Sequence, residues 1–105
     1  MRKENTKPRY HTVTVGLPFM AFYQAVMREH AGSLPSDTLD AARQIDRLIN
    51  QTAVEQVNEM AKDIKSKRFT AVRNMDVDAD IISVSVAIED EKEALLFKLA
   101  NGAQN

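Results

Sequence analysis

The chain has 105 residues, of which 44% are hydrophobic and 28% are charged, and it contains no cysteine. These values predict one soluble globular domain, and the lack of cysteine excludes disulfides, zinc–thiolate sites and thiol nucleophiles. No run of about 18 apolar residues occurs, so we expect no membrane contact. The basic N-terminus is not followed by the apolar stretch of a secretory signal, and we therefore expect a cytoplasmic protein.

The formal net charge of −1 conceals an uneven distribution. Residues 1–73 carry 12 Lys and Arg against 8 Asp and Glu, whereas residues 74–105 carry 2 against 7. Residues 1–73 thus carry a net charge of +4, and residues 74–105 carry a net charge of −5. Either this polarity orients the protein on a polyanion or a partner, or it is the scatter expected of a short chain.

Residues 1–9 are polar and basic, which predicts a flexible arm ahead of a single domain at residues 10–105. The arm carries the cations Arg2, Lys3, Lys7 and Arg9. Such an arm can become ordered on a nucleic acid or on another subunit.

Residues 10–17 alternate between apolar and polar or small side chains, which predicts a β-strand. Val13, Val15 and Leu17 share one face, and we expect that face to lie on the core. Thr12 and Thr14 lie on the other face, which is half exposed or covered by something polar.

A helix is predicted after Pro18, which suits a first helical turn. It covers residues 19–31, and Gly32 is expected to close it in a left-handed conformation. Its apolar stripe is unusually broad. We expect the stripe either to form a subunit interface or to be a core helix wrapped by the same chain. The candidate interface residues are Phe19, Met20, Phe22, Tyr23, Val26, Met27 and His30.

Asp37 is the predicted N-cap of a second helical segment, whose apolar spacing continues as far as Lys65. The segment is one helix or two, because Thr52 and Glu55 match a capping box that would start a new helix. The basic residues at its end either complement the negative helix C-terminus or form a phosphate-binding patch. They are Lys62, Lys65, Lys67 and Arg68.

The second half of the chain predicts a short strand at residues 69–75, a polar turn at 76–80 and a strong strand at 81–88. Asp90 is the expected N-cap of a last helix, although residues 93–100 could also form a strand. The resulting prediction is a small α+β domain in the order β-α-α-β-β-α. Its sheet is antiparallel or mixed, and its helices cover one face.

No motif for catalysis or for a cofactor is present, so we expect no enzyme activity, no cofactor and no metal. Asp76, Asp78 and Asp80 have the spacing that begins an EF-hand loop. The loop also requires Gly at its sixth position and Glu at its twelfth, where this chain has Ile81 and Ala87.

Residues 10–50 resemble the ribbon-helix-helix DNA-binding proteins of the Arc/MetJ type. The likeness lies in the basic arm, His-Thr-Val-Thr-Val-Gly-Leu-Pro at 11–18, the helix after it, and the capped helix near Asp37. The resemblance implies a dimer whose paired strands enter the major groove. Including the basic positions elsewhere, the candidate nucleic-acid contacts are Arg2, Lys3, Lys7, Arg9, Tyr10, Thr12, Thr14, Lys65, Lys67 and Arg68.

Residues 87–102 are similar to the C-termini of small tailed-phage proteins of unassigned role, which implies a phage origin and a place in the host cytoplasm or the virion. Our leading hypothesis is a homo-oligomeric module for protein interaction, assembly or regulation, with a protein partner. The alternative is a dimeric DNA-binding regulator that uses strand 10–17 and the basic arm.

Overall fold

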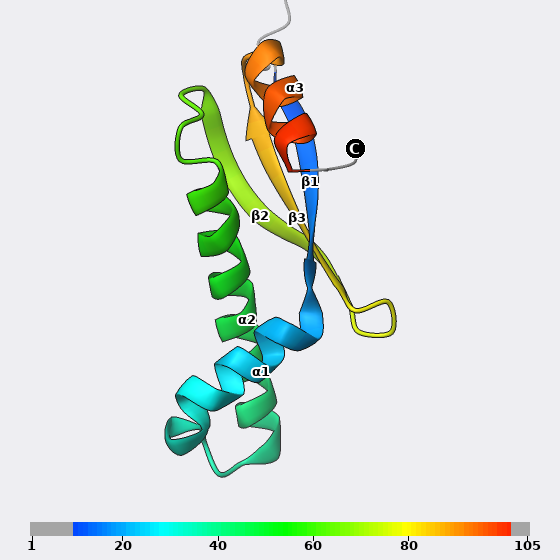
Figure 1. Ribbon diagram of the computed structural model, residues 1–105. Helices are drawn as coiled ribbons and strands as arrows, with labels where there is room; N and C mark the ends of the chain where they lie inside the picture. Colours follow the sequence, from blue (N-terminus) through cyan, green and yellow to red (C-terminus); the bar gives the residue numbers. More distant parts are fainter. Residues whose placement is uncertain (1–9, 102–105) are drawn as a thin grey trace, which may run out of the picture.

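The computed structural model describes residues 10–101. They form a three-stranded antiparallel sheet and three α-helices in the predicted order, β-α-α-β-β-α (Figure 1). The strands are β1 (His11–Pro18), β2 (Lys67–Asp76) and β3 (Ile81–Ile88). The helices are α1 (Phe19–His30), α2 (Thr38–Met60) and α3 (Glu91–Ala100), and a 3-10 turn (Ala31–Ser33) follows α1. The predicted α+β fold class is therefore confirmed.

The central strand of the sheet is β3, with β1 and β2 on either side. β1 pairs with β3 along its whole length, from His11 opposite Ile88 to Pro18 opposite Ile81, without a break in register. The pairing of β2 with β3 is interrupted twice, by register shifts between Lys67 and Phe69 and between Val72 and Asn74. Because both outer strands run antiparallel to β3, they run parallel to one another.

One face of the sheet carries the hydrophobic core. Alternate residues of β1 and β3 point to this face and are buried: Val13, Val15, Leu17, Ile82, Val84, Val86 and Ile88. They form one cluster with Ile49, Ala53 and Val57 of α2 and with Ala94 and Phe97 of α3. The helices therefore cover one face, as predicted, while the Thr, Ser and Gly residues of the opposite face remain outside the cluster. No helix within residues 10–101 is long and apolar enough to cross a membrane.

The two longest helices form a hairpin (Figure 1). α1 and the first turns of α2 extend beyond the sheet, whereas the later turns of α2 pack against it. α2 is a single helix, which decides between the two alternatives left by the sequence. Thr52 does not cap a new helix, because its hydroxyl donates to the carbonyl oxygen of Leu48, 2.7 Å away, inside the continuous helix. The helix ends at Met60, so the apolar spacing overestimated its length.

The helix ends combine expected and unexpected features. The side chains of Asp37 and Asp90 accept hydrogen bonds from the first turns of α2 and α3, as predicted for N-caps. Pro18 differs from its prediction, because it is the last residue of β1 and lies just outside α1. Gly32 also differs: it lies in the 3-10 turn without a left-handed backbone conformation, and right-handed Ala31 is the C-cap.

The first turn of α1 is capped by a residue of the β2–β3 turn. The side chain of Asp80 accepts a hydrogen bond from the backbone N–H of Met20 at 2.6 Å, and its carbonyl oxygen accepts one from Phe19 at 3.3 Å. Asp80 itself has a positive φ of 59°, a conformation that Asp adopts more readily than most residues. This residue therefore ties the turn to the junction between β1 and α1.

Candidate functional site

The strand β1 forms one outer edge of the sheet. The bond from Phe19 N–H to the Asp80 carbonyl continues the ladder between β1 and β3. Antiparallel ladders alternate, so the odd-numbered residues of β1 direct their backbone groups toward β3. The backbone groups of Thr14 and Gly16 consequently point away from β3. Pro18 is also even-numbered, so its backbone nitrogen points away from β3. Its lack of an N–H therefore removes no hydrogen bond between the two strands.

The other edge of the sheet is protected. β2 contains the two register shifts and carries the charged residues Lys67, Arg68 and Arg73. Bulges and charged side chains are the usual features that prevent an edge strand from pairing with another chain. β2 is thus a strand that discourages further pairing.

The edge at β1 has neither of these features. Its register with β3 is regular, and His11 is its one ionisable side chain. The hydroxyl groups of Thr14 and Ser85 are 3.3 Å apart within the sheet, and Gly16 is exposed. A strand edge with a regular register, several β-branched residues and no Lys, Arg, Asp or Glu is the type that accepts another strand.

α3 lies beside this edge (Figure 1). A hollow of about 180 Å³ separates the two elements, and it is lined by His11, Thr12, Val13, Glu91, Ala94, Leu95 and Lys98. Three leucines of α3 are largely exposed: Leu95 at 53%, Leu96 at 59% and Leu99 at 69%. Three exposed leucines on a helix of ten residues form an apolar surface that the chain itself leaves uncovered.

The interface residues predicted on α1 divide into two groups. Phe19 and Val26 are buried in the core of the same chain, and Phe22 and Tyr23 pack partly buried against it. The rings of Phe19 and Tyr23 are stacked with centroids 6.1 Å apart. Met27 and His30 are half-buried, and Met20 is exposed. Part of the stripe thus packs within the core of the chain itself, and the subunit interface at this helix stays a prediction.

Among the predicted nucleic-acid contacts that the structure describes, Tyr10 and the basic residues at 65–68 lie at one end of the sheet, where β1 and β2 both begin. Tyr10 contacts Phe69 of β2 edge-to-face, with ring centroids 5.6 Å apart, and the two side chains are 43% and 50% exposed. The basic segment of Lys65, Lys67 and Arg68 begins the same strand, while Thr12 and Thr14 lie further along β1. The four arm residues Arg2, Lys3, Lys7 and Arg9 fall outside the described part of the chain.

Two acidic side chains, Glu89 and Glu93, lie next to this basic segment. Arg68 forms an ion pair with Glu89, and the ammonium group of Lys67 donates to Asn58 Oδ1 at 2.9 Å. Glu93 accepts hydrogen bonds from the hydroxyl and the backbone N–H of Ser66, at 2.6 and 3.1 Å. The Ser66 hydroxyl, followed by its backbone N–H, holds the pKa of Glu93 below its ordinary value. These contacts join the start of β2 to α3.

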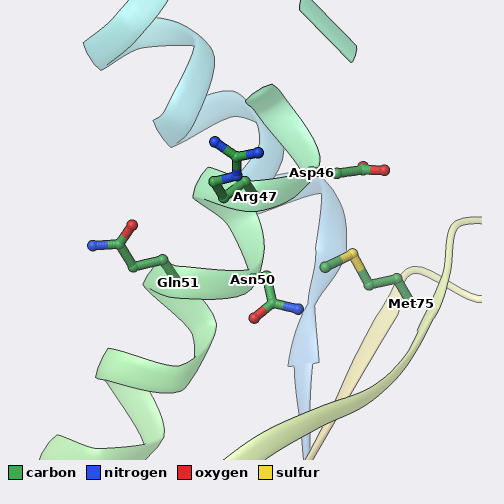
Figure 2. Close-up of a pocket in the computed structure, with 5 residues that line it drawn as sticks. All are labelled: Asp46, Arg47, Asn50, Gln51 and Met75. Carbon is green, nitrogen blue, oxygen red and sulfur yellow. The ribbon is translucent and has the colours of Figure 1, made fainter. Parts of the chain in front are cut away.

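A second hollow of about 450 Å³ lies between α2 and the end of β2. It is lined by Asp46, Arg47, Asn50, Gln51 and Met75. Figure 2 shows that the Asp46 carboxylate and the Arg47 guanidinium point in different directions, so the polar groups do not converge on one point. The arrangement offers no fixed set of partners for a bound molecule.

Within residues 10–101 no group of three or more His, Asp or Glu side chains is placed to hold a metal ion. The carboxylate of Asp76 accepts from the N–H of Ala79 at 3.0 Å, and that of Asp80 caps α1. His11 is on β1 and His30 is at the far end of α1, so the two histidines are not brought together.

Two features of this region were missed in the sequence. The role of Asp80 depends on a contact with a residue 60 positions away, which no local pattern indicates. The exposed leucines did leave a signal. α3 buries Ala94 and Phe97 against the sheet, and its sequence contains three leucines in addition to these. The three are Leu95, Leu96 and Leu99.

Comparison of the chain with models of protein families finds no matching family, and comparisons with curated proteins and with solved structures find no significant match.

Proposed function

We propose that the protein is a non-enzymatic assembly module in which β1 pairs with β1 of a second copy. The observation that carries the proposal is the difference between the two edges of the sheet. β2 has register shifts and cations, whereas β1 is regular and has no Lys, Arg, Asp or Glu. Natural proteins rarely leave an edge of this kind unprotected unless something pairs with it.

A second copy fits the edge because two antiparallel copies of β1 match each other in side-chain orientation and in charge. Two antiparallel copies of β1 related by a twofold axis keep their Val and Leu side chains on the same side of the enlarged sheet. No like charges oppose each other along the strand. The sheet would then contain six strands in the order β2-β3-β1-β1-β3-β2, with both protected edges outermost and helices on a single face.

The likeness of residues 87–102 to tailed-phage proteins is in keeping with an assembly role in a virion or in the host cytoplasm. The pairing also gives the small chain a larger shared core, which is a common way for domains of this size to gain stability.

The test is the oligomeric state of a matched pair of variants, Gly16→Pro and Gly16→Ala. Proline removes a backbone N–H that points outward, so each chain keeps its ladder with β3 while the intermolecular ladder loses a donor. Alanine keeps the N–H, and its Cβ would lie 3.7 Å from Ile81 Cγ2, an ordinary contact. Sedimentation over a concentration series should show dimers for the wild type and Gly16→Ala, and monomers for Gly16→Pro with an unchanged circular dichroism spectrum. A wild type that stays monomeric at its highest soluble concentration would overturn the proposal.

A second candidate function is nucleic-acid binding at the end of the sheet where β1 and β2 begin. It is supported by the meeting of Tyr10, the exposed ring of Phe69 and the basic segment at 65–68. Aromatic side chains on an open sheet face can stack with unpaired bases, and cations contact phosphates. The acidic neighbours Glu89 and Glu93 weaken the positive potential there, so we rank this function below assembly.

Binding of this kind should weaken steeply as salt is raised, because each Lys or Arg contact with a phosphate releases counterions. A mobility-shift titration with single- and double-stranded DNA at low salt tests it directly. Loss of binding in Phe69→Ala and Tyr10→Ala would support the stacking role. No shift at low salt with either form of DNA would rule out this function.

A further inference from the structure

The helix α3 carries a row of side chains along the side that faces the outer edge of β1. Glu91, Leu95 and Lys98 all line the hollow beside that strand. Leu99, the most exposed of the three leucines, follows Leu95 at a spacing of four residues and therefore lies next to it on the helix surface. Ala94 and Phe97 are buried against the sheet. Leu96 lies roughly 100° around the helix from Leu95. It neighbours Leu99 at a spacing of three residues, on the flank of Leu99 that is farther from β1.

We infer that Leu95 and Leu99 are the second half of the interface and pack against the same two leucines of the partner copy. The inference rests on the proposed pairing of β1 with β1. A twofold axis perpendicular to the sheet brings the two α3 helices together on the same face, because both helices cover the core side of their own β1. The two helices then run antiparallel across the seam between the copies.

Charge favours this antiparallel arrangement. α3 begins with Glu91 and Glu93 in its first turn and has Lys98 in its last turn. When two copies run in opposite directions, the acidic start of each helix approaches the basic end of the other. The helix dipoles are also opposed, which is the favourable orientation for neighbouring helices. The hollow beside β1 gives the partner's leucine side chains space to insert.

The exposure of these two leucines in the single chain also supports a second copy as the partner. Leu95 and Leu99 are more than half exposed, although the core of the chain is complete without them. Leu95 lines the hollow beside the strand edge, and Leu99 adjoins Leu95 one helical turn further on. A strand pair alone would leave these leucines in water, whereas a partner helix covers them when the strands pair.

The experiment compares the double variant Leu95→Lys/Leu99→Lys with the matched control Leu96→Lys by sedimentation of the full chain. All three side chains are exposed in the single chain, so each variant should fold with the wild-type circular dichroism spectrum. The double variant should weaken dimerisation by about tenfold or more, because covering even one leucine is worth about a decade in an equilibrium constant. Leu96→Lys should remain near the wild-type dissociation constant.

Three other results would each overturn the inference, and they are distinguishable. If the double variant dimerises as well as the wild type while Gly16→Pro does not, the strands pair but α3 takes no part. If Leu96→Lys weakens the dimer as much as the double variant, the contact is a general effect of charge on α3 and is not made by one side of the helix. If the wild type is monomeric, the proposed function fails and the inference fails with it.

Discussion

Removing the side chain of Asp80 should destabilise the protein through two separable effects. The carboxylate caps the first turn of α1 by accepting a hydrogen bond from Met20 N–H at 2.6 Å, and loss of a helix cap costs about 1 kcal/mol. The backbone of Asp80 has a positive φ of 59°, and an alanine forced into that conformation costs roughly 1 kcal/mol more. Asp80→Ala should therefore lower the free energy of unfolding by about 2 kcal/mol in all.

Two further substitutions at the same position separate the cap from the backbone conformation. Asp80→Gly loses the cap but adopts positive φ without cost, so it should lose only about 1 kcal/mol. Asp80→Asn keeps an oxygen acceptor and tolerates the left-handed conformation, so it should remain close to the wild type.

The assay is urea denaturation of the four proteins at one fixed concentration, because the proposed dimerisation would make the midpoints depend on concentration. The expected order of stability is wild type, Asp80→Asn, Asp80→Gly and Asp80→Ala. The reasoning would be refuted if Asp80→Ala unfolded at the wild-type midpoint. A lower stability for Asp80→Gly than for Asp80→Ala would refute the contribution assigned to the positive φ.

Three other substitutions test the core, the helix hairpin and the contact between β2 and α3. Val84→Asp should abolish folding, because it places an unpaired charge at a fully buried position of the central strand; a cooperative melt like that of the wild type would contradict the core assignment. Phe22→Ala should lose about 2 to 3 kcal/mol in urea denaturation, somewhat less than a fully buried Phe because Phe22 is only partly buried, and light scattering should show an unchanged oligomer. Glu93→Gln should alter the pH dependence of stability. The folded-state pKa of Glu93 lies below its ordinary value of 4.5, so its contribution is present above that pH and is lost as the pH falls through the lowered value. Thermal melts at a series of acidic pH values should show a smaller loss of stability for Glu93→Gln than for the wild type, and parallel pH profiles would contradict the role given to the Ser66 contacts.

Local patterns in the sequence were sufficient for most of the secondary structure. Alternation of side chains located β1 and β3 to within a residue, because a strand with one buried face must alternate. Asp37 and Asp90 located the starts of α2 and α3, because a free N–H group of a first helical turn needs a nearby acceptor. Gly32 failed as a marker because the 3-10 turn satisfied the end of α1 without a left-handed residue.

The sequence by itself determined which residues of each strand and helix are apolar, and hence the α+β class with helices on one face. It could not determine which strand would pair with which, since the partners Thr14 and Ser85 are 71 positions apart and no local pattern relates them. Only the tertiary structure placed β3 in the centre, left β1 as a regular edge and set Leu95 of α3 beside it. The physical reason is that local patterns report what each segment buries, whereas the site depends on how segments far apart in the sequence come to lie beside one another.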